Sequence, residues 1–354
     1  MALSLPYYSN ACIINTGQTC KGRMKRLLPF LLLGLFACGL LPTPQPTPVP
    51  TVAATFTPTA PSPDAALGSA KNPLILALPP SARPTSDVIN AGNVLKSQLE
   101  KSTGYKIIVV APPNETELVK AFANGNAHIG VLSPFGYLMA NNADKADAAF
   151  ARQRDGAIFY GAQFIVQSEA GFTSYFDSLK NENTADASVA LTQFADKKPC
   201  WTDNLSPSGY VVPLGFLGEA NVKPLEPAFV NGHPTVVRAV YAKGICDFGA
   251  TYIDARTYPG LENEFPDVMK KVIVVWRIPP IIPYETLVFA HGMKIDTRRA
   301  LERAFVDAML TPDGKLAMQT LYGFDAMQVV QNGQYDEFRK AVKFSGLSLG
   351  DLVK

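Results

Sequence analysis

Short apolar runs alternate with helix-like segments from residue 72 onward, and this alternation limits the fold of the chain more than any other feature. Residues 74–78 read Leu-Ile-Leu-Ala-Leu, a continuous apolar run typical of a buried strand. The next segment begins with a helix-capping Thr85 or Ser86 and ends at Gly104. The same order restarts after residue 170. Two such blocks predict an α/β fold with two lobes, each a mostly parallel sheet flanked by helices.

The N-terminal residues are not expected to be part of this fold. Basic residues between positions 21 and 26 precede an apolar run from Leu27 to Phe36, which is followed by Ala37 and Cys38. This pattern is typical of an export signal, and the run is too short to span a bilayer. A cysteine directly after a small residue indicates a lipoprotein signal with Cys38 as the lipid anchor. A plain signal peptide with an incidental cysteine is the alternative, and Met24 is an alternative start.

The residues after Cys38 alternate proline with threonine, alanine and serine. Such a stretch cannot build a core and favours extended polyproline geometry. We interpret residues 1–38 as a leader and residues 39–70 as a stalk that holds the folded part away from a membrane. The predicted location is therefore extracytoplasmic, with lipid anchoring to the cell membrane.

Charge and motif content exclude several classes of function. The formal net charge is +2, which argues against a nucleic-acid binder because that class needs a basic surface. The sequence has no nucleophile elbow, no zinc-protease motif, no P-loop and no Cys/His cluster with metal spacing. We therefore expect no enzyme, no metal and no cofactor.

Cys200 and Cys246 are the two cysteines of the expected mature domain. An oxidising compartment allows a disulfide between them. Two buried free thiols are the alternative, and the sequence favours neither.

Two segments with small hydroxyl residues follow apolar runs and begin helices. Residues 132–137 read Leu-Ser-Pro-Phe-Gly-Tyr, and residues 206–210 read Ser-Pro-Ser-Gly-Tyr. Helices that start at the carboxyl ends of strands direct backbone N–H groups and a positive dipole end at a ligand, which favours an anion. Two ordinary capped helices are the alternative. One such segment in each block favours an anion site between them.

Taken in order, these segments resemble motifs of the phosphonate/phosphite-binding proteins of ABC importers, a branch of the type 2 periplasmic-binding-protein fold. The resemblance extends over about residues 72–345. Further segments that match the family are a Gly232-His233 turn, the strand motif at 244–250 and the loop at 276–285. It implies a ligand cleft between the lobes. The ligand-binding residues that it implies are Ser133, Tyr137, Ser206, Ser208, Gly209, Tyr210, His233, Asp254 and Glu285.

The chain departs from the family pattern at several of these positions. Pro207 stands where the family often has threonine, Ile278 where serine or threonine is common, and Glu285 where aspartate is usual. Residues 114–116 lack the tyrosine that some members place near there. These departures do not change the class of ligand that the resemblance implies, but they leave the identity of the ligand open.

The resemblance implies a monomeric solute receptor that passes a small oxyanion to an ABC permease. Lobe 1 would comprise residues 71–165 plus 285–354 and lobe 2 residues 166–284, with hinges near 163–166 and 283–287. The rival interpretations are a two-lobed enzyme and a receptor of the same fold for a sulfonate, phosphate or thiamin precursor, or for a sensor.

Serine hydroxyls and His233 are expected to donate hydrogen bonds to the oxygens of the ligand. The carboxylates of Asp254 and Glu285 would repel an anion that has no hydrogen-bond donor. They therefore favour a ligand with a donor, such as an aminophosphonate or a protonated monoester. The alternative is that these two carboxylates are solvated or make structural hydrogen bonds.

Overall fold

The computed structural model describes residues 66–354. The predicted leader, the anchor Cys38 and nearly all of the predicted stalk lie outside the described residues. All the described elements belong to one compact unit, Thr59–Lys354. Within residues 66–354, no helix combines the length and the apolar character needed to cross a membrane.

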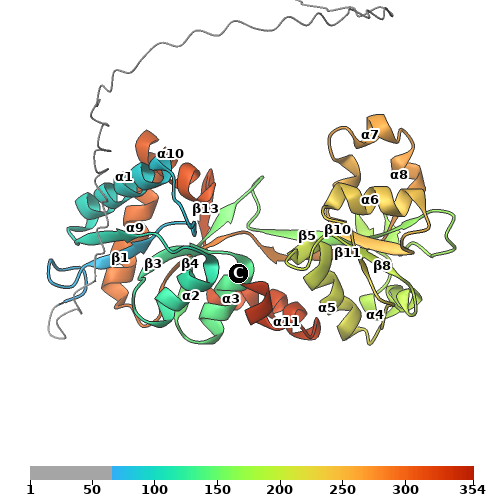
Figure 1. Cartoon of the computed structure of the whole chain (residues 1–354), viewed down its shortest axis with the longest axis horizontal. Helices are drawn as coiled ribbons and strands as arrows, with labels where there is room; N and C mark the ends of the chain where they lie inside the picture. The colour runs from blue at the N-terminus through green and yellow to red at the C-terminus, as the bar shows by residue number, and fades with distance from the viewer. Residues whose placement is uncertain (1–65) are drawn as a thin grey trace, which may run out of the picture. The chain divides into compact units, whose positions relative to one another are not determined.

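A six-stranded sheet forms the first lobe (Figure 1). Its strands, in spatial order, are β13 (Ala326–Val329), β4 (Ala146–Gln153), β12 (Thr286–Ala290), β3 (Ile129–Leu132), β1 (Leu74–Ala77) and β2 (Ile107–Val110). The helices α1 (Ser86–Thr103), α9 (Ile295–Leu310) and α10 (Pro312–Tyr322) pack together on one side. On the other side lie α2 (Glu115–Ala123) and α3 (Pro134–Asn142). Apolar side chains such as Leu95, Leu301 and Phe305 join the first helix group to the sheet.

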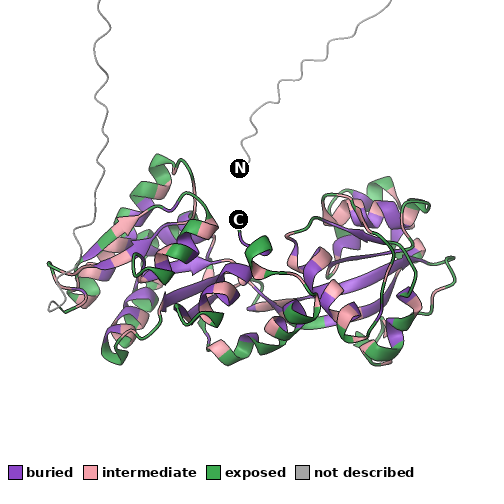
Figure 2. Cartoon of the chain, turned by 60° about the horizontal axis from the view of Figure 1, so that its bottom comes forward, coloured by how far each residue is buried: buried purple, intermediate pink, exposed green. Residues whose placement is uncertain are grey.

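A five-stranded sheet forms the second lobe. Its strands, in spatial order, are β11 (Val272–Pro283), β5 (Phe159–Gln167), β10 (Phe248–Tyr252), β8 (Pro199–Trp201) and β9 (Ala228–Phe229), and β6 (Phe176–Asp177) with β7 (Glu182–Asn183) forms a separate hairpin. Its helices are α4 (Ala187–Ala190), α5 (Val212–Glu219), α6 (His233–Ala242), α7 (Leu261–Glu264) and α8 (Val268–Lys271). Short helical turns lie at η1 (Thr192–Phe194), η2 (Pro207–Val211) and η3 (Ala255–Thr257). Figure 2 shows that the strands are buried while the outer faces of the helices are exposed.

The two-lobed α/β class is confirmed, but the expectation of mostly parallel sheets is wrong. β1 runs parallel to β2 and β3, and β8 runs parallel to β9 and β10. However, β12 is antiparallel to β3 and β4, β13 to β4, and β5 to β10 and β11. The physical reason is the connectivity. Two neighbouring parallel strands must be joined by a long crossover. The chain instead leaves the first sheet from β4 to β5 and returns to it from β11 to β12, in both cases through a short connection.

These two connections, residues 154–158 and 284–285, link the lobes. The C-terminal helices add a third link, because α11 (Asp336–Phe344), which follows η4 (Asn332–Tyr335), packs against α5. A Cβ atom on Gly215 would lie 2.0 Å from the Ala341 carbonyl oxygen, so the two helices touch at this glycine. The predicted lobe boundaries did not anticipate this contact, and they remain a prediction.

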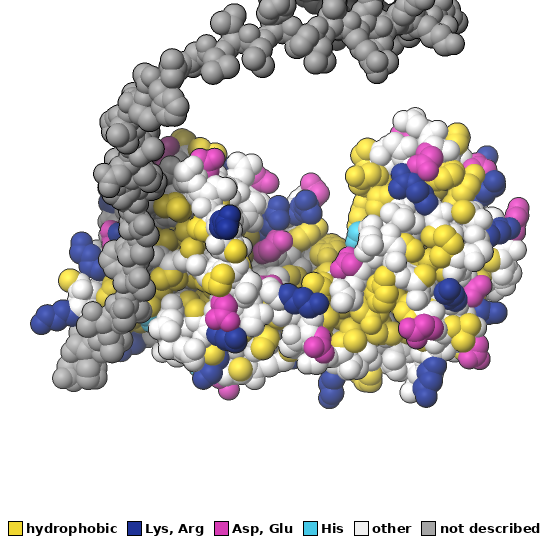
Figure 3. Space-filling model, in the orientation of Figure 1, with side chains coloured by type: hydrophobic (Ala, Val, Ile, Leu, Met, Phe, Trp, Pro, Cys, Tyr) yellow, Lys and Arg dark blue, Asp and Glu magenta, His cyan; other side chains and the backbone are white. Residues whose placement is uncertain are grey.

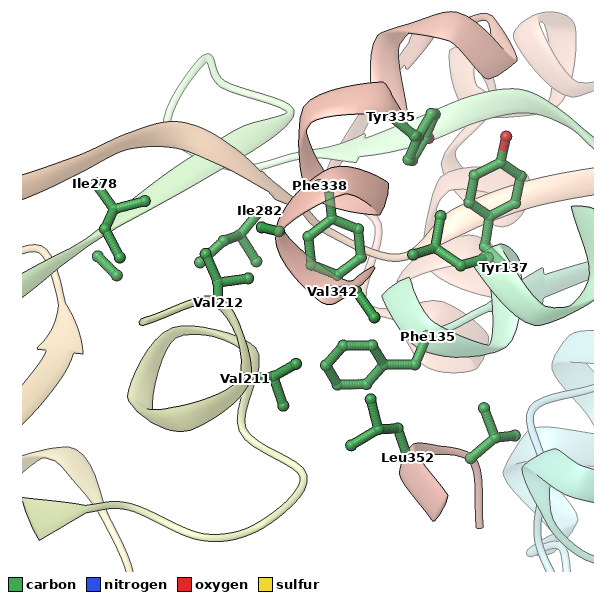
Figure 4. Close-up of a cluster of buried hydrophobic side chains, with 14 of the residues drawn as sticks. Phe135, Tyr137, Val211, Val212, Ile278, Ile282, Tyr335, Phe338, Val342 and Leu352 are labelled. Atoms are coloured by element: carbon green, nitrogen blue, oxygen red, sulfur yellow. The ribbon is translucent and has the colours of Figure 1, made fainter. Parts of the chain in front are cut away.

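A buried apolar cluster fills the space between these elements (Figure 4). Phe135 at the start of α3 stacks on Phe338 of α11 with the ring centroids 5.7 Å apart. Val211 and Val212 face these rings from the second lobe, and Leu352 of α12 (Leu349–Leu352) lies below them. Apolar side chains of both lobes are therefore packed together in this cluster.

Cys200 and Cys246 are joined by a disulfide with the sulfur atoms 2.11 Å apart. Cys200 lies in β8, whereas Cys246 belongs to the motif at 244–250 and precedes β10. The bridge ties β8 to the segment that connects α6 with β10.

Candidate functional site

A cavity of about 570 Å³ opens where the two connections cross between the sheets. We call it the interlobe cleft. Figure 3 shows charged side chains of both signs around the hollow and a histidine at its edge. The residues that line the cleft are Glu115, Ser133, Pro134, Phe135, Arg152, Arg154, Tyr160, Leu205, Pro207, Ser208, His233, Tyr252, Ile253, Pro283, Tyr284, Glu285, Leu352 and Lys354.

Four of the nine predicted ligand residues lie on this cleft: Ser133, Ser208, His233 and Glu285. The other five do not line it: Tyr137, Ser206, Gly209, Tyr210 and Asp254. Within residues 66–354, no group of three or more histidine, cysteine or acidic side chains is placed to hold a metal ion.

Ser133 caps helix α3, as the sequence predicted, and its Oγ accepts a hydrogen bond from the Gly136 N–H at 3.2 Å. The start of this helix is not open to a ligand anion, however. The Ser133 N–H donates to Oε1 of Glu115 at 2.7 Å. A Cβ atom on Gly136 would lie 2.3 Å from the same oxygen, so glycine is needed there to admit the carboxylate. The chain's own Glu115 therefore occupies the place that the sequence assigned to the ligand.

The second hydroxyl-rich segment divides its residues between the cleft and the core. Ser206 Oγ accepts from the Gly209 N–H at 3.1 Å and so caps the helix. Gly209 packs against Thr202, where a Cβ atom would come within 2.2 Å of the hydroxyl. Tyr210 packs edge-on against Phe229. Ser208 alone among these four faces the cleft.

Ser208 and Tyr160 of β5 both line the cleft. Burial raises the pKa of Tyr160 to about 12, and the Ser208 side chain opposes this rise. Tyr160 therefore stays protonated at neutral pH, and this hydroxyl pair presents donors and acceptors without a charge.

His233 begins helix α6 and lies on the cleft wall. Its Nδ1 accepts a hydrogen bond from the Tyr252 N–H at 3.3 Å. Burial lowers the pKa of the imidazole to about 4, while Asp203 acts in the opposite direction. The ring is therefore neutral at pH 7, and because Nδ1 is an acceptor, its proton lies on Nε2. His233 thus offers one N–H donor.

Tyr137 differs most from its expected role. Its side chain is fully buried, and its hydroxyl donates to Oδ1 of Asn332 at 3.0 Å. Its ring packs against that of Tyr335, with the centroids 4.3 Å apart. Tyr137 is a core residue that ties α3 to the C-terminal segment, because a partner distant in the sequence holds its polar end.

Asp254 has the structural role that the sequence left as the alternative. Its carboxylate accepts hydrogen bonds from Arg256 at 2.5 Å and from Gln163 at 2.7 Å, and it pairs with Arg277 at 3.4 Å. Burial raises the pKa of this carboxyl group, but the hydrogen bonds and charge of Arg256 outweigh it, so the net pKa is lowered. Two arginines therefore balance the charge of Asp254 in this structure.

Sequence reasoning missed two arginines on the cleft. Arg152 forms an ion pair with Glu285 at 3.1 Å. Arg154 lies 5.8 Å from the centre of the Tyr284 ring, which itself stacks on Tyr160. Within residues 66–354, Arg154 has no carboxylate at ion-pair distance. Their alternate spacing at the end of β4, where the chain leaves the first sheet, is the signal that could have found them.

Known proteins supply the remaining comparison. The family described as the periplasmic substrate-binding protein of phosphonate ABC transporters matches residues 81–335. The phosphate-import protein PhnD of Mycolicibacterium smegmatis is 27% identical over 181 residues, or 48% of this chain and 52% of that protein. The chain thus spans about half the length of this curated relative.

Two solved structures of XAC2383 from Xanthomonas citri share the fold. The form bound to ATP gives a TM-score of 0.55 at 14% identity and covers 79% of this chain and 99% of that one. The form bound to a chloride ion gives 0.52 at 14% identity, covering 78% and 98%. At this identity the likeness establishes the fold alone. The family match spans most of the described residues, and its members are binding components of transporters, not enzymes. The chain therefore belongs to the family of periplasmic substrate-binding proteins of phosphonate ABC transporters.

Proposed function

We propose that this protein captures a small phosphonate-, phosphite- or phosphate-like oxyanion in the interlobe cleft and delivers it to an ABC permease. The observation that supports this most directly is Arg154, a cationic side chain on the cleft with no acidic partner among the described residues. Neutral donors from Ser208 and His233 lie on the same cavity. A tetrahedral oxyanion needs such a set of fixed donors, and charge-assisted bonds contribute about 1.5–3 kcal/mol each.

Closure of the lobes would complete the site. The connections 154–158 and 284–285 are the short segments that carry the chain between the sheets, and such segments are typical hinges. Rotation of the second sheet and its helices about these connections would bring Ser208 and His233 toward Arg154. The apolar lining from Leu205 and Ile253 would then exclude water and strengthen the polar contacts.

Two substitutions test the position of the anion. Ser208→Ala should weaken the binding of methylphosphonate by about tenfold, and Arg154→Met by about ten- to hundredfold, because each removes one bond to a charged ligand. Titration calorimetry measures both dissociation constants. Arg299→Met is the matched control, since it removes the same charge from an exposed position of α9. Parent-like affinity in both cleft variants would place the ligand elsewhere.

The proposal includes a monomer that is anchored to the membrane through lipid on Cys38. Cys38→Ala should move the protein from the membrane to the soluble fraction, because an acylated cysteine supplies the apolar chains that hold such a protein at the bilayer. Cell fractionation with immunoblotting measures this. Cys20→Ala is the control, because Cys20 precedes the apolar run and should not change the fractionation. Continued membrane retention of Cys38→Ala would contradict the anchor.

A further inference from the structure

The carboxylate of Glu115 lies where an oxygen of the ligand would approach the start of helix α3. Glu115 lines the interlobe cleft together with Ser133 and also lines the adjoining cavity of about 260 Å³. Its Oε1 accepts the Ser133 N–H at 2.7 Å, in the space that Gly136 leaves open. An acidic side chain is thus built into the wall of a site for an anion.

The partners of Glu115 distinguish it from the other acid on the cleft. Glu285 is neutralised by its ion pair with Arg152. In the part of the chain that the structure describes, Glu115 has no lysine or arginine at ion-pair distance, and its Oε2 accepts no hydrogen bond. This second oxygen is therefore available to a ligand.

An ionised carboxylate can only accept hydrogen bonds. An approaching oxyanion with no proton meets it as a like charge with no hydrogen bond to offset the repulsion. An oxyanion that carries a proton donates an O–H···O⁻ hydrogen bond instead, which is among the stronger bonds available. Phosphate monoesters have a second pKa near 6 and phosphonates are likewise dibasic, so a fraction of such ligands carries a proton at neutral pH and the cleft can bind that form, whereas a sulfonate is monobasic and has no such form.

We infer that Glu115 makes the cleft select oxyanions that keep an ionisable proton, the hydrogen phosphonates and hydrogen phosphates, over sulfonates of the same size. This inference rests on the proposed function and adds a selectivity residue to it. It also replaces the amine-binding role expected of Asp254, because the donor that the cleft requires is then the proton on the oxyanion itself.

Methylphosphonate and methanesulfonate form the test pair, since they match closely in size and shape and differ in the ionisable proton. Titration calorimetry at pH 7 on the purified protein should show that methylphosphonate binds at least about tenfold more tightly. Glu115→Gln keeps an oxygen for the Ser133 N–H and turns the other oxygen into an N–H₂ donor. This preference should fall by about tenfold or more in that variant.

Glu117→Gln is the matched control. Glu117 lies on the same helix, is exposed, and pairs with Lys120 at 2.8 Å away from the cleft. The control should keep the preference of the parent.

Four outcomes would overturn the inference. Equal binding of the two probes by the parent, or an unchanged preference in Glu115→Gln, would overturn it and leave the proposed function standing. Weakened binding of 2-aminoethylphosphonate but not of methylphosphonate in Glu115→Gln would assign Glu115 to an amine instead. A parent that binds none of these ligands would overturn the proposed function and the inference together.

Discussion

Asp254→Asn is expected to lower the free energy of unfolding by about 3 kcal/mol. The change removes the negative charge between two arginines whose side chains are only 10% and 18% exposed, Arg256 and Arg277. Breaking a buried pair by removing one partner leaves an uncompensated buried charge, and this accounts for the size of the effect. Urea denaturation measures the loss. Asp186→Asn is the control, because Asp186 is exposed and makes no side-chain capping bond.

The pH dependence of stability should change with the same substitution. The folded-state pKa of Asp254 lies below its ordinary value. The stabilisation is therefore fully present above the unfolded pKa of about 4 and is lost as the pH falls through the lower folded pKa. The parent should lose this contribution on acidification, whereas Asp254→Asn has none to lose. Equal stability changes in both proteins between pH 5 and pH 2 would contradict the buried ion pair.

Asp254→Asn also separates a structural role from a role in ligand binding. If Asp254 only holds Arg256 and Arg277, the ratio of affinities for 2-aminoethylphosphonate and methylphosphonate should stay as in the parent. A selective loss of the amine-bearing ligand would restore the role that the sequence resemblance implied.

Local patterns predicted the parts of the site that depend on local structure. Ser133 and Ser206 cap helices that follow strands, because a capping hydroxyl and a proline in the first turn specify a helix start over a few residues. Ser208 and His233 fall on the cleft for the same reason, since both belong to helix starts at one edge of the second sheet.

The remaining features of the site depend on contacts between segments that are distant in the sequence. Local sequence patterns do not predict such contacts. Tyr137 is held in the core by Asn332, which lies 195 residues later in the chain. The ion pair between Arg152 and Glu285 depends on the antiparallel pairing of β4 with β12. That pairing arises because the chain leaves and re-enters the first sheet, which the alternation of strands and helices does not specify. The expectation of mostly parallel sheets was wrong for the same reason.

Removal of the Cys200–Cys246 disulfide is expected to produce the largest change in stability. The bridge closes a loop of 46 residues, and restriction of the unfolded chain by such a loop contributes about 4 kcal/mol at 25 °C. The loop contains both Ser208 and His233, so the bridge stabilises the segment that carries the second-lobe donors of the cleft. The double variant Cys200→Ala/Cys246→Ala should therefore unfold at much lower urea concentration.

Reduction provides the matched comparison for this variant. The parent in reductant should lose a similar amount of stability, while the double variant should be insensitive to reductant because it has no bridge to break. Methylphosphonate should still bind the double variant well below its unfolding midpoint, since neither cysteine lines the cleft. If both thiols of the parent are alkylated under denaturing conditions without reductant, the bridge is absent in the protein. The double variant should then be as stable as the parent, apart from the small effect of truncating a buried Cys200.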